Sequence, residues 1–396
     1  MTGQPLALYV HWPFCVSKCP YCDFNSHVRE SIDQDAWCAA LLADLAHEAR
    51  LLTNRTLTSI FFGGGTPSLM DPAMVEAVIS AACDAWTPSG DIEITLEANP
   101  NSVEAARFAD VAAAGVNRLS LGLQSFDDRA LAFLGRAHSS REGFRALEIA
   151  QRRFRRVSFD LIYALPGDTE DSWSAMLAQA LSLGTSHLSL YELTIEPGTR
   201  FATDVVKRRF DPLDTDAAAT LYELTDAMAS DAGMPAYEIS NHARHGHESR
   251  HNLTYGRYGD YAGIGPGAHG RRLGMRTVRH RKPENFLSAI RRNRHGLVEE
   301  ATLKPTEAAD EALVMGLRLR EGVDVAAIAK RFGLESVVDF GRVDRFARSG
   351  HLTRDGSRIA LTAAGRLLLD HILGEIALSD PIPSSPVESL LQASAA

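Results

Sequence analysis

The chain of 396 residues is long enough for one large α/β domain and a smaller one. Its hydrophobic content of 45% and charged content of 23% are ordinary for a globular protein, and its net charge of −9 argues against general nucleic-acid binding. The sequence contains neither a signal-peptide pattern nor a membrane-spanning apolar run, and three of its five cysteines lie in one short stretch, which indicates a reducing compartment. We therefore expect a cytoplasmic protein without a nucleic-acid partner.

A loop near the N-terminus carries three cysteines, with three and then two residues between them: Cys15, Cys19 and Cys22. Pro13 and Pro20 exclude a regular helix across the loop. Thiolates are soft ligands that suit zinc, copper(I) or iron–sulfur clusters, and three of them would leave one iron of a [4Fe–4S] cluster open. Two alternatives stay open: a disulfide that leaves one cysteine over, and zinc with His11 or His27 as the fourth ligand.

Strand-like runs alternate with helical ones through the first half of the chain. Each run is followed by a crossover, which implies a parallel sheet with right-handed connections. The six expected strands cover residues 6–14, 57–62, 92–97, 118–124, 157–163 and 187–193. Because six units are too few for a closed eight-stranded barrel, we expect a partial, open (β/α)6 barrel with its site at the carboxyl ends of the strands.

Polar and glycine-rich residues collect at these strand ends. The run Gly63-Gly64-Gly65-Thr66-Pro67 closes the second strand, where glycines let the backbone approach a ligand. The polar side chains at or just beyond the ends of the next three strands are Glu97, Gln124, Arg136 and Asp160. Each alone could be a solvated loop residue or a helix cap, but together they supply donors and acceptors for a zwitterionic, ribose-bearing ligand.

Two further segments stand out between residues 236 and 304. The run His251-Asn252-Leu253-Thr254-Tyr255 contains one of fourteen histidines. Such a residue is usually a hydrogen-bonded structural one, although a neutral imidazole can bind iron axially. Residues 271–294 are rich in Arg and Lys and contain a single acid, Glu284. The default interpretation of this stretch is a solvated basic face, and the alternative is an attractive surface for an anionic ligand or acidic partner.

Short helices followed by a hairpin are predicted from residue 305. The helices are expected at 308–319, 324–332 and 337–349, the hairpin at 350–362, and a closing helix from Ala363. This order is typical of a winged-helix module. The expected organisation is therefore a barrel over 1–235, a connecting and basic segment over 236–304, a winged-helix-like domain over 305–378 and a mobile tail over 379–396.

The cysteine loop, with Tyr21 directly before its third cysteine, resembles the cluster loop of radical S-adenosylmethionine (SAM) enzymes. Together with Gly63–Ser68, Glu97–Pro100, Gly122–Phe126 and Asp160–Gly167, it resembles the oxygen-independent coproporphyrinogen oxidase family over residues 6–375. The resemblance implies a [4Fe–4S] cluster on the three cysteines and SAM on its open iron. It also implies that eight residues contact SAM, namely Tyr9, Gly64, Gly65, Thr66, Glu97, Gln124, Arg136 and Asp160.

Two features favour the heme-chaperone branch of this family. Phe24 stands where the true oxidases have a further cysteine, and the first strand begins too early for their N-terminal arm. The segment from His251 resembles the chaperone motif whose histidine is the proposed heme ligand, although Gly256 replaces its tryptophan. We thus expect a heme chaperone that passes heme to an acceptor, such as a membrane-associated hemoprotein. The alternatives are a catalytic coproporphyrinogen III oxidase and, more distantly, a zinc-binding winged-helix regulator.

Overall fold

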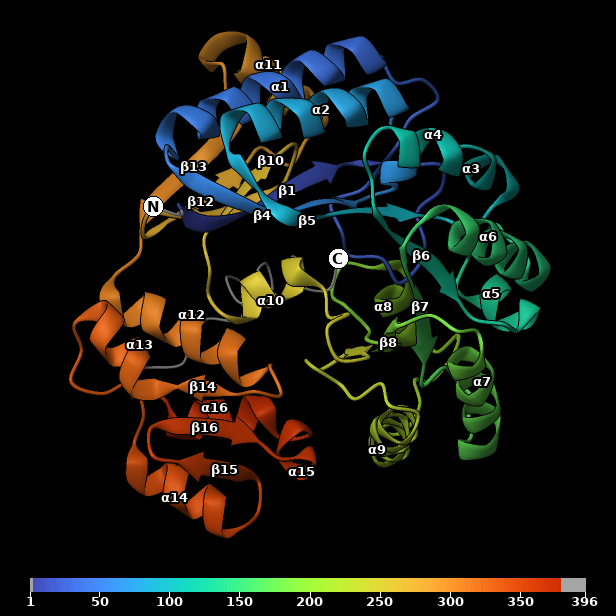
Figure 1. Ribbon diagram of the computed structural model, residues 1–396. Helices are drawn as coiled ribbons and strands as arrows, with labels where there is room; N and C mark the ends of the chain where they lie inside the picture. Colours follow the sequence, from blue (N-terminus) through green and yellow to red (C-terminus); the bar gives the residue numbers. More distant parts are fainter. Residues whose placement is uncertain (1–2, 379–396) are drawn as a thin grey trace.

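Six parallel strands form the centre of an eleven-stranded sheet in the computed structural model, which describes residues 3–378. Neighbours along the chain are also neighbours in the sheet, and every pair is parallel. The strands are β1 (Gln4–Trp12), β4 (Arg55–Gly64), β5 (Thr87–Ala98), β6 (Arg118–Gln124), β7 (Arg156–Tyr163) and β8 (His187–Glu192). The predicted six-unit partial barrel is confirmed, and the sheet is curved, with a concave side that is called the lumen below (Figure 1).

The crossover helices lie on the outer, convex side of the sheet (Figure 1). They are α1 (Gln34–Leu51), α2 (Pro72–Ala85), α3 (Ser102–Ala106), α4 (Phe108–Ala113), α5 (Asp128–Phe133), α6 (Ser140–Arg153), α7 (Glu170–Ser182) and α9 (Thr215–Asp231). α8 (Arg200–Val206) instead packs against the cysteine loop, where Phe201 N donates to Pro20 O at 2.9 Å. Side-chain caps fix where several of them begin. Ser139, for example, forms a capping box with Glu142 at the start of α6, which satisfies amide groups that have no partner inside the helix.

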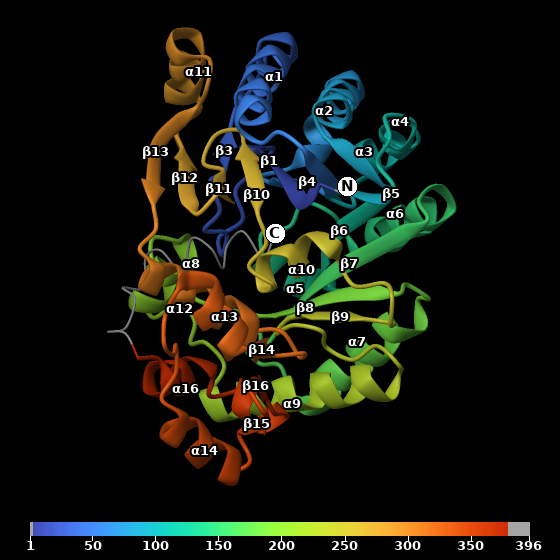
Figure 2. The same cartoon turned by 60° about the vertical axis from the view of Figure 1, so that its left-hand side comes forward.

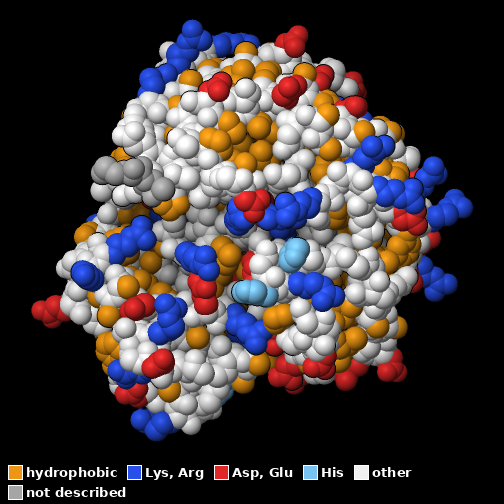
Figure 3. All heavy atoms as spheres, viewed as in Figure 1, with side chains coloured by type: hydrophobic (Ala, Val, Ile, Leu, Met, Phe, Trp, Pro, Cys, Tyr) orange, Lys and Arg blue, Asp and Glu red, His pale blue; other side chains and the backbone are white. Residues whose placement is uncertain are grey.

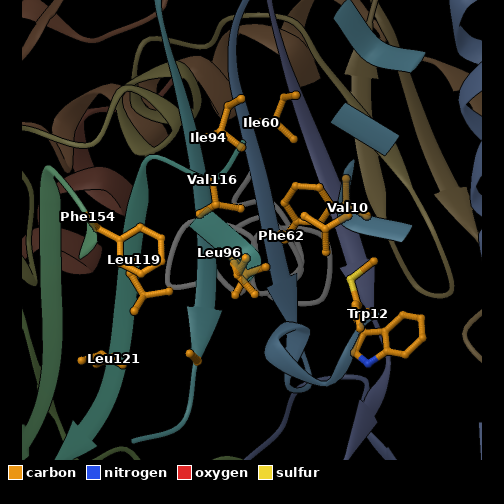
Figure 4. Packing of buried hydrophobic residues seen from close by; sticks show 14 of the residues in the cluster. Val10, Trp12, Ile60, Phe62, Ile94, Leu96, Val116, Leu119, Leu121 and Phe154 are labelled. Atoms are coloured by element: carbon orange, nitrogen blue, oxygen red, sulfur yellow. The ribbon is translucent and has the colours of Figure 1, made fainter. Parts of the chain in front are cut away.

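Alternation along each strand divides the side chains between an outer core and the lumen. In β1, Leu8 and Val10 point outward into a large buried cluster, together with residues such as Phe62 and Leu96 from neighbouring strands (Figure 4). Tyr9 lies between them in sequence and belongs to a second cluster on the lumen side. The outer face therefore holds the helices in place and leaves the other face of the strands for polar side chains.

The sheet continues beyond the six predicted strands on both edges. β9 (Asn241–Ala243) pairs antiparallel with β8, whereas β10 (Tyr261–Ile264) pairs parallel with β1. β11 (His269–Arg272), β12 (Met275–Arg279) and β13 (Leu297–Thr302) then extend the sheet antiparallel, beside α11 (Pro283–Asn293) (Figure 2). The segment 236–304 thus contributes strands to the same sheet as residues 4–192.

The basic stretch after residue 270 is not simply a solvated face, so that default interpretation is wrong for part of it. Arg272 and Arg279 are fully buried on β11 and β12. Arg279 forms ion pairs with Asp44 at 3.1 Å and Glu48 at 2.6 Å, and Arg272 also pairs with Glu48, at 2.5 Å. Both acids lie on α1 and are themselves buried. These charges tie the late strands to the first helix of the barrel.

A smaller domain follows, built on a three-stranded antiparallel sheet in the order β14-β16-β15. Its elements are α12 (Pro305–Leu317), β14 (Val323–Asp324), α13 (Val325–Phe332), α14 (Phe340–Arg348), β15 (Leu352–Asp355), β16 (Arg358–Leu361), α15 (Ala363–Arg366) and α16 (Leu369–Ile376). The helix, strand, helix, helix and hairpin order confirms the winged-helix-like expectation. Basic and acidic side chains are interspersed over the face seen in Figure 3. The tail predicted over 379–396 lies outside the described residues.

The small domain packs against the barrel through aromatic and charged contacts. Tyr258 donates a hydrogen bond to Glu311 of α12 at 2.7 Å, and its backbone oxygen accepts one from Arg331 of α13. Arg366 pairs with Asp226 of α9 at 3.1 Å. Within residues 3–378, no helix is both long and apolar enough to cross a membrane.

Candidate functional site

Cys15 ends β2 (Phe14–Cys15), Cys19 and Cys22 lie on the loop that leads from it to β3 (His27–Val28), and all three are free thiols. Cys15 Sγ accepts a hydrogen bond from the Thr66 hydroxyl, and Cys19 Sγ accepts one from Arg136 Nη1, each at 3.4 Å. Burial raises the pKa of Cys15, and it raises that of Cys22 to about 11. Such half-buried, soft donors with polar groups aimed at two of the sulfurs fit a thiolate-bound cluster.

A zinc site with a histidine ligand fits this geometry less well. His11 is buried, and both its ring nitrogens have partners: Nδ1 lies 2.9 Å from the Tyr9 hydroxyl and Nε2 lies 3.0 Å from Asn25 O. His27 Nε2 lies 3.3 Å from Asn25 Oδ1. Among residues 3–378, no three His, Cys, Asp or Glu side chains converge closely enough to hold one metal ion. Thiolates on a cluster bind different iron atoms, so they do not need to converge on one point.

The glycine run at the end of β4 packs against the cysteine loop. Gly65 N donates to Trp12 O at 2.7 Å and Thr66 N donates to Phe14 O at 2.8 Å. A Cβ at Gly65 would lie 2.7 Å from Phe14 O, so the close approach excludes a side chain there. Gly64 N donates to Glu97 Oε2 at 3.2 Å. These three N–H groups are therefore already used, and the run serves first to seat the loop.

Four predicted residues meet at the ends of the next strands. Arg136 reaches Asn99 Oδ1 at 2.5 Å and Gly122 O at 3.0 Å, while its Nε is buried and has no partner within residues 3–378. Gln124 Oε1 is likewise buried and unpaired among the described residues. Unpaired buried donors and acceptors of this kind are rare unless a ligand or water completes them. Together with the carboxylates described next, they fit a zwitterionic ligand such as SAM.

Glu97 and Asp160 are part-buried carboxyl groups on β5 and β7. Burial, and secondly the nearby Asp160, raises the pKa of Glu97 to about 8. Burial also raises the pKa of Asp160 to about 6, against the hydrogen bonds from Ser189 and Ser120 and the charge of Arg136. A cation placed between the two carboxyl groups would favour their ionised forms. The pair is therefore suited to bind a positively charged ligand.

Tyr9 lies deeper in the lumen, between the cofactor end and His251. Its ring centroid is 6.2 Å from that of His251 and 6.3 Å from that of Phe61. The Tyr9 hydroxyl bonds to His11 Nδ1, and the His11 ring lies next to Gly64. In this structure Tyr9 therefore positions the ring of His11 beside the glycine run. The sequence placed Tyr9 with the SAM-contacting group, and the structure puts it on the same face of β1 as His11.

His251 lies on α10 (Arg250–Gly256), a short helix inside the concave side of the sheet (Figure 1). It is only 1% exposed and stacks on Phe61 at 4.9 Å between centroids. Nδ1 lies 3.0 Å from Ser59 Oγ and Nε2 lies 2.8 Å from the Tyr255 hydroxyl. Burial lowers the pKa of His251 to about 3, so the ring is neutral at physiological pH. Both nitrogens are occupied in this conformation.

Glu93 is a central lumen residue that the sequence interpretation missed. It is fully buried on β5, and its carboxylate accepts hydrogen bonds from Arg250 N at 2.9 Å and His251 N at 3.3 Å, at the start of α10. Arg118 balances its charge at 3.3 Å. Glu93 is four residues before Glu97, so strand alternation places both on one face. The alternation along this strand was the feature of the sequence that could have predicted Glu93 as a site residue.

A small polar cavity lies between α10 and the strands. This cavity of about 20 Å³ lies beneath Glu97 and Asp160, which is room for about one water molecule. Its walls are mostly polar and include Thr95, Arg118, Ser120, Ser158, His187, Ser189, Asn241, Ser249 and Asn252. Thr95 Oγ1, His187 Nδ1 and Asn252 Oδ1 are buried without partners among the described residues.

Comparison with known proteins agrees with this fold. The model of the radical SAM superfamily matches residues 9–180, and that of the HemN C-terminal domain matches residues 303–368. The solved structure of coproporphyrinogen III oxidase (HemN) from Escherichia coli superposes with a TM-score of 0.79 and 23% identity, covering 94% of this chain and 90% of that one. The fold and the cysteine loop thus define a radical SAM protein.

The curated relatives narrow the family. Heme chaperone HemW from Escherichia coli is 36% identical over 379 residues, covering 93% of this chain and 97% of its own length. HemW from Mycobacterium tuberculosis H37Rv is also 36% identical, with coverage of 94% and 95%. Radical S-adenosyl methionine domain-containing protein 1, mitochondrial, from Bos taurus is 41% identical over 81% of this chain and 75% of its own length. The chain belongs to the HemW family.

Proposed function

We propose that this protein is a heme chaperone that binds a [4Fe–4S] cluster and SAM, and that passes heme to an acceptor protein. The family to which the chain belongs supports the proposal, because its bacterial relatives are named heme chaperones. The acceptor is a hemoprotein, such as a membrane-associated one. The alternative within the same fold is oxidative decarboxylation of coproporphyrinogen III.

The packing of the lumen is the observation that carries the choice between these two activities. An oxidase must enclose a tetrapyrrole beside SAM, and pockets for ligands of that size hold about 300–1,000 Å³. The cavity beneath Glu97 and Asp160 holds about 20 Å³ because α10 occupies the space. A carrier needs no enclosed reaction chamber, so the filled lumen favours the chaperone.

In the proposed arrangement, Cys15, Cys19 and Cys22 hold the cluster. When bound, the cluster supplies a redox-active iron centre with one iron open to SAM. Arg136 donates to the Cys19 sulfur and Thr66 to the Cys15 sulfur, so a hydrogen bond orients each of these two proposed ligands. The SAM cation is held near Glu97 and Asp160, and Gln124 and Arg136 present their unpaired polar atoms to the rest of the ligand. Tyr9, Gly64 and Gly65 shape the floor of the site.

His251 is the proposed axial ligand of heme. Its neutral ring meets the first requirement for binding iron, since a protonated imidazole cannot coordinate. The hydrogen bond between Nε2 and Tyr255 and the 1% exposure show that heme cannot reach the ring in the described conformation. Heme ligation therefore requires α10 to leave the lumen.

A heme titration with matched variants tests the proposal. We expect the anaerobically purified protein to bind heme. His251→Ala should weaken heme binding at least about tenfold, which corresponds to about 1.4 kcal/mol, and it should shift the Soret band. His245→Ala, in an exposed loop, is the control and should leave the titration unchanged. Tyr255→Phe keeps the ring packing but frees Nε2, so it should tighten heme binding even if the alanine variant folds poorly.

An assay with coproporphyrinogen III distinguishes the alternative. The protein reconstituted with its cluster, SAM and a reductant should leave coproporphyrinogen III unchanged. Efficient formation of protoporphyrinogen IX would overturn the carrier assignment in favour of the oxidase.

A further inference from the structure

Asn25 joins the end of the cysteine loop to a distant part of the chain. Its side-chain nitrogen donates to Pro266 O at 2.9 Å and to Arg281 O at 3.0 Å. Its side-chain oxygen lies 3.3 Å from His27 Nε2. An amide group has two N–H donors, so this side chain uses both of them on backbone carbonyls more than 240 residues away in sequence.

The backbone around Asn25 is fastened to the first strand as well. Asn25 O lies 3.0 Å from His11 Nε2, and the other nitrogen of that ring bonds to the Tyr9 hydroxyl. His27 N donates to Pro13 O at 2.7 Å. The loop therefore ends between β1 on one side and the β10–β12 strands on the other, and β3 lies beside β10 and β11 in Figure 2.

The partner segment is shaped for this contact at Gly267. Its φ of +85° lies in the region that L-residues rarely adopt, and a Cβ there would stand 2.5 Å from Asn25 Nδ2. Gly267 N donates to His280 O at 3.0 Å, which brings the carbonyl groups of Pro266 and Arg281 to the same side chain. Two motifs far apart in sequence thus meet at one amide.

The contacts of the three cysteines differ in range. Cys15 lies in a strand and Cys19 is held by Arg136, whereas Cys22 has local contacts: its N donates to Cys19 O at 3.2 Å and its Sγ lies 4.0 Å from Ser26 Oγ. The position of Cys22 therefore follows that of the residues just after it. Asn25 is three residues further along the chain.

We propose that Asn25 is a positioning residue that fixes Cys22 for cluster binding, by fastening the loop end to the carbonyl groups of Pro266 and Arg281. The inference rests on the proposed cluster site and adds a residue to it. It also makes the late strands of the sheet, which follow the His251 helix in sequence, part of the cluster's support.

Asn25→Asp tests the contact with almost no change of shape. The carboxylate places an acceptor against two carbonyl oxygens, so both hydrogen bonds are lost. Loss of two neutral hydrogen bonds corresponds to about 5- to 150-fold in an equilibrium constant. We expect the reconstituted variant to lose its brown absorbance to an iron chelator faster by a factor in this range, and its electron paramagnetic resonance spectrum to change. Asn25→Ser has a side chain too short to reach the two carbonyl groups and adds no charge. It should lose the cluster faster in the same way as Asn25→Asp.

Glu284→Gln is the matched control. It breaks the exposed ion pair between Glu284 and Arg29, which joins the residue after β3 to α11, but leaves the Asn25 contacts intact. Its chelator rate should stay within about twofold of the wild type, since exposed pairs contribute little. If both Asn25 variants lose the cluster to the chelator at the wild-type rate, the role of Asn25 is overturned but the proposed cluster site is not. A wild-type protein that holds no iron at all would overturn the proposed cluster site with it.

Discussion

The neighbouring carboxyl groups of Glu97 and Asp160 predict how SAM affinity depends on pH. Glu97 has a pKa of about 8 in the ligand-free protein because it is buried beside Asp160. SAM carries positive charge, and its proposed binding pairs that charge with ionised carboxylates. The ligand therefore binds the minor, ionised form of Glu97, and the free energy of ionising that group is subtracted from the binding energy.

The size of the effect follows from the pKa. With a pKa of about 8, the ionised fraction of Glu97 rises from about 1% at pH 6 to about 24% at pH 7.5, so the Kd for SAM should fall about 20-fold over this range. Asp160, with a pKa of about 6, adds about twofold. Glu97→Gln should remove the larger part of this pH dependence, so that the Kd for SAM falls only about twofold between pH 6 and pH 7.5.

Calorimetric titration of the reconstituted protein with SAM at several pH values provides the assay, and titrations in buffers of different ionisation enthalpy report the proton released. A Kd that does not change with pH in the wild type would refute the pairing of Glu97 with the SAM cation. So would a Glu97→Gln variant that keeps the full slope.

The same pKa has a consequence for stability without ligand. The folded-state pKa is raised above its unfolded value, so Glu97 binds its proton more tightly in the folded protein, and stability falls as pH rises from about 4.5 to about 8. Glu97→Gln should therefore match the wild type at pH 4 and exceed it at pH 7, by at most about 3 kcal/mol. Chemical denaturation of the ligand-free proteins at the two pH values measures this.

Three further variants test other parts of the structure. Cys19→Ser should abolish the brown chromophore after anaerobic reconstitution, whereas Cys38→Ser on α1 should retain it. Gly256→Trp should lower the free energy of unfolding by about 1–3 kcal/mol in denaturant titrations rather than improve heme binding, because a Cβ there would already lie 2.6 Å from Leu319. Arg279→Leu should cost about 3–5 kcal/mol in the same titrations, since it removes a cation from two buried carboxylates of α1 and leaves Glu48 paired with Arg272 alone.

The six central strands could be predicted because each carries its own signal. Apolar runs such as residues 57–62 and 118–124 are bounded by turn residues and separated by helical patterns, and the handedness of the crossovers then leaves few topologies. The structure extends β4 to Arg55–Gly64 and matches β6 over Arg118–Gln124. Local patterning was sufficient for this part of the fold.

The late strands could not be predicted in the same way. β11 and β12 contain charged residues such as Arg272 and Arg279, which suggest solvent when they are considered alone. They are buried only because Asp44 and Glu48 face them from α1, more than 220 residues earlier. Pairing of this kind depends on distant partners, which hydrophobic periodicity does not reveal.

The candidate site likewise contains residues that local sequence predicts and residues whose role depends on distant partners. The cysteines could be named from their spacing, since the loop that carries them is local. From the sequence, Gly256 stands where an aromatic partner for heme is expected. In the structure it is the point where α10 passes Leu319. The role of Asn25 depends on Pro266 and Arg281 and is visible only in three dimensions.

The position of α10 bears on how a heme carrier would release its cargo. His251 is 1% exposed and its Nδ1 lies 3.0 Å from Ser59 of β4, so the closed position of α10 and bound heme exclude each other. The Tyr255 hydroxyl, which lies on the same helix, must also release Nε2 before iron can bind there. If closing α10 is favoured by about 2.7 kcal/mol, about 1% of molecules are open, and the apparent heme affinity is about 100-fold weaker than that of the open form. Closure then competes with heme directly, because the Glu93 contacts that seat the helix re-form as heme leaves. The packing that leaves no room for a tetrapyrrole beside the proposed SAM site therefore makes heme binding by His251 reversible, which is the property a carrier requires.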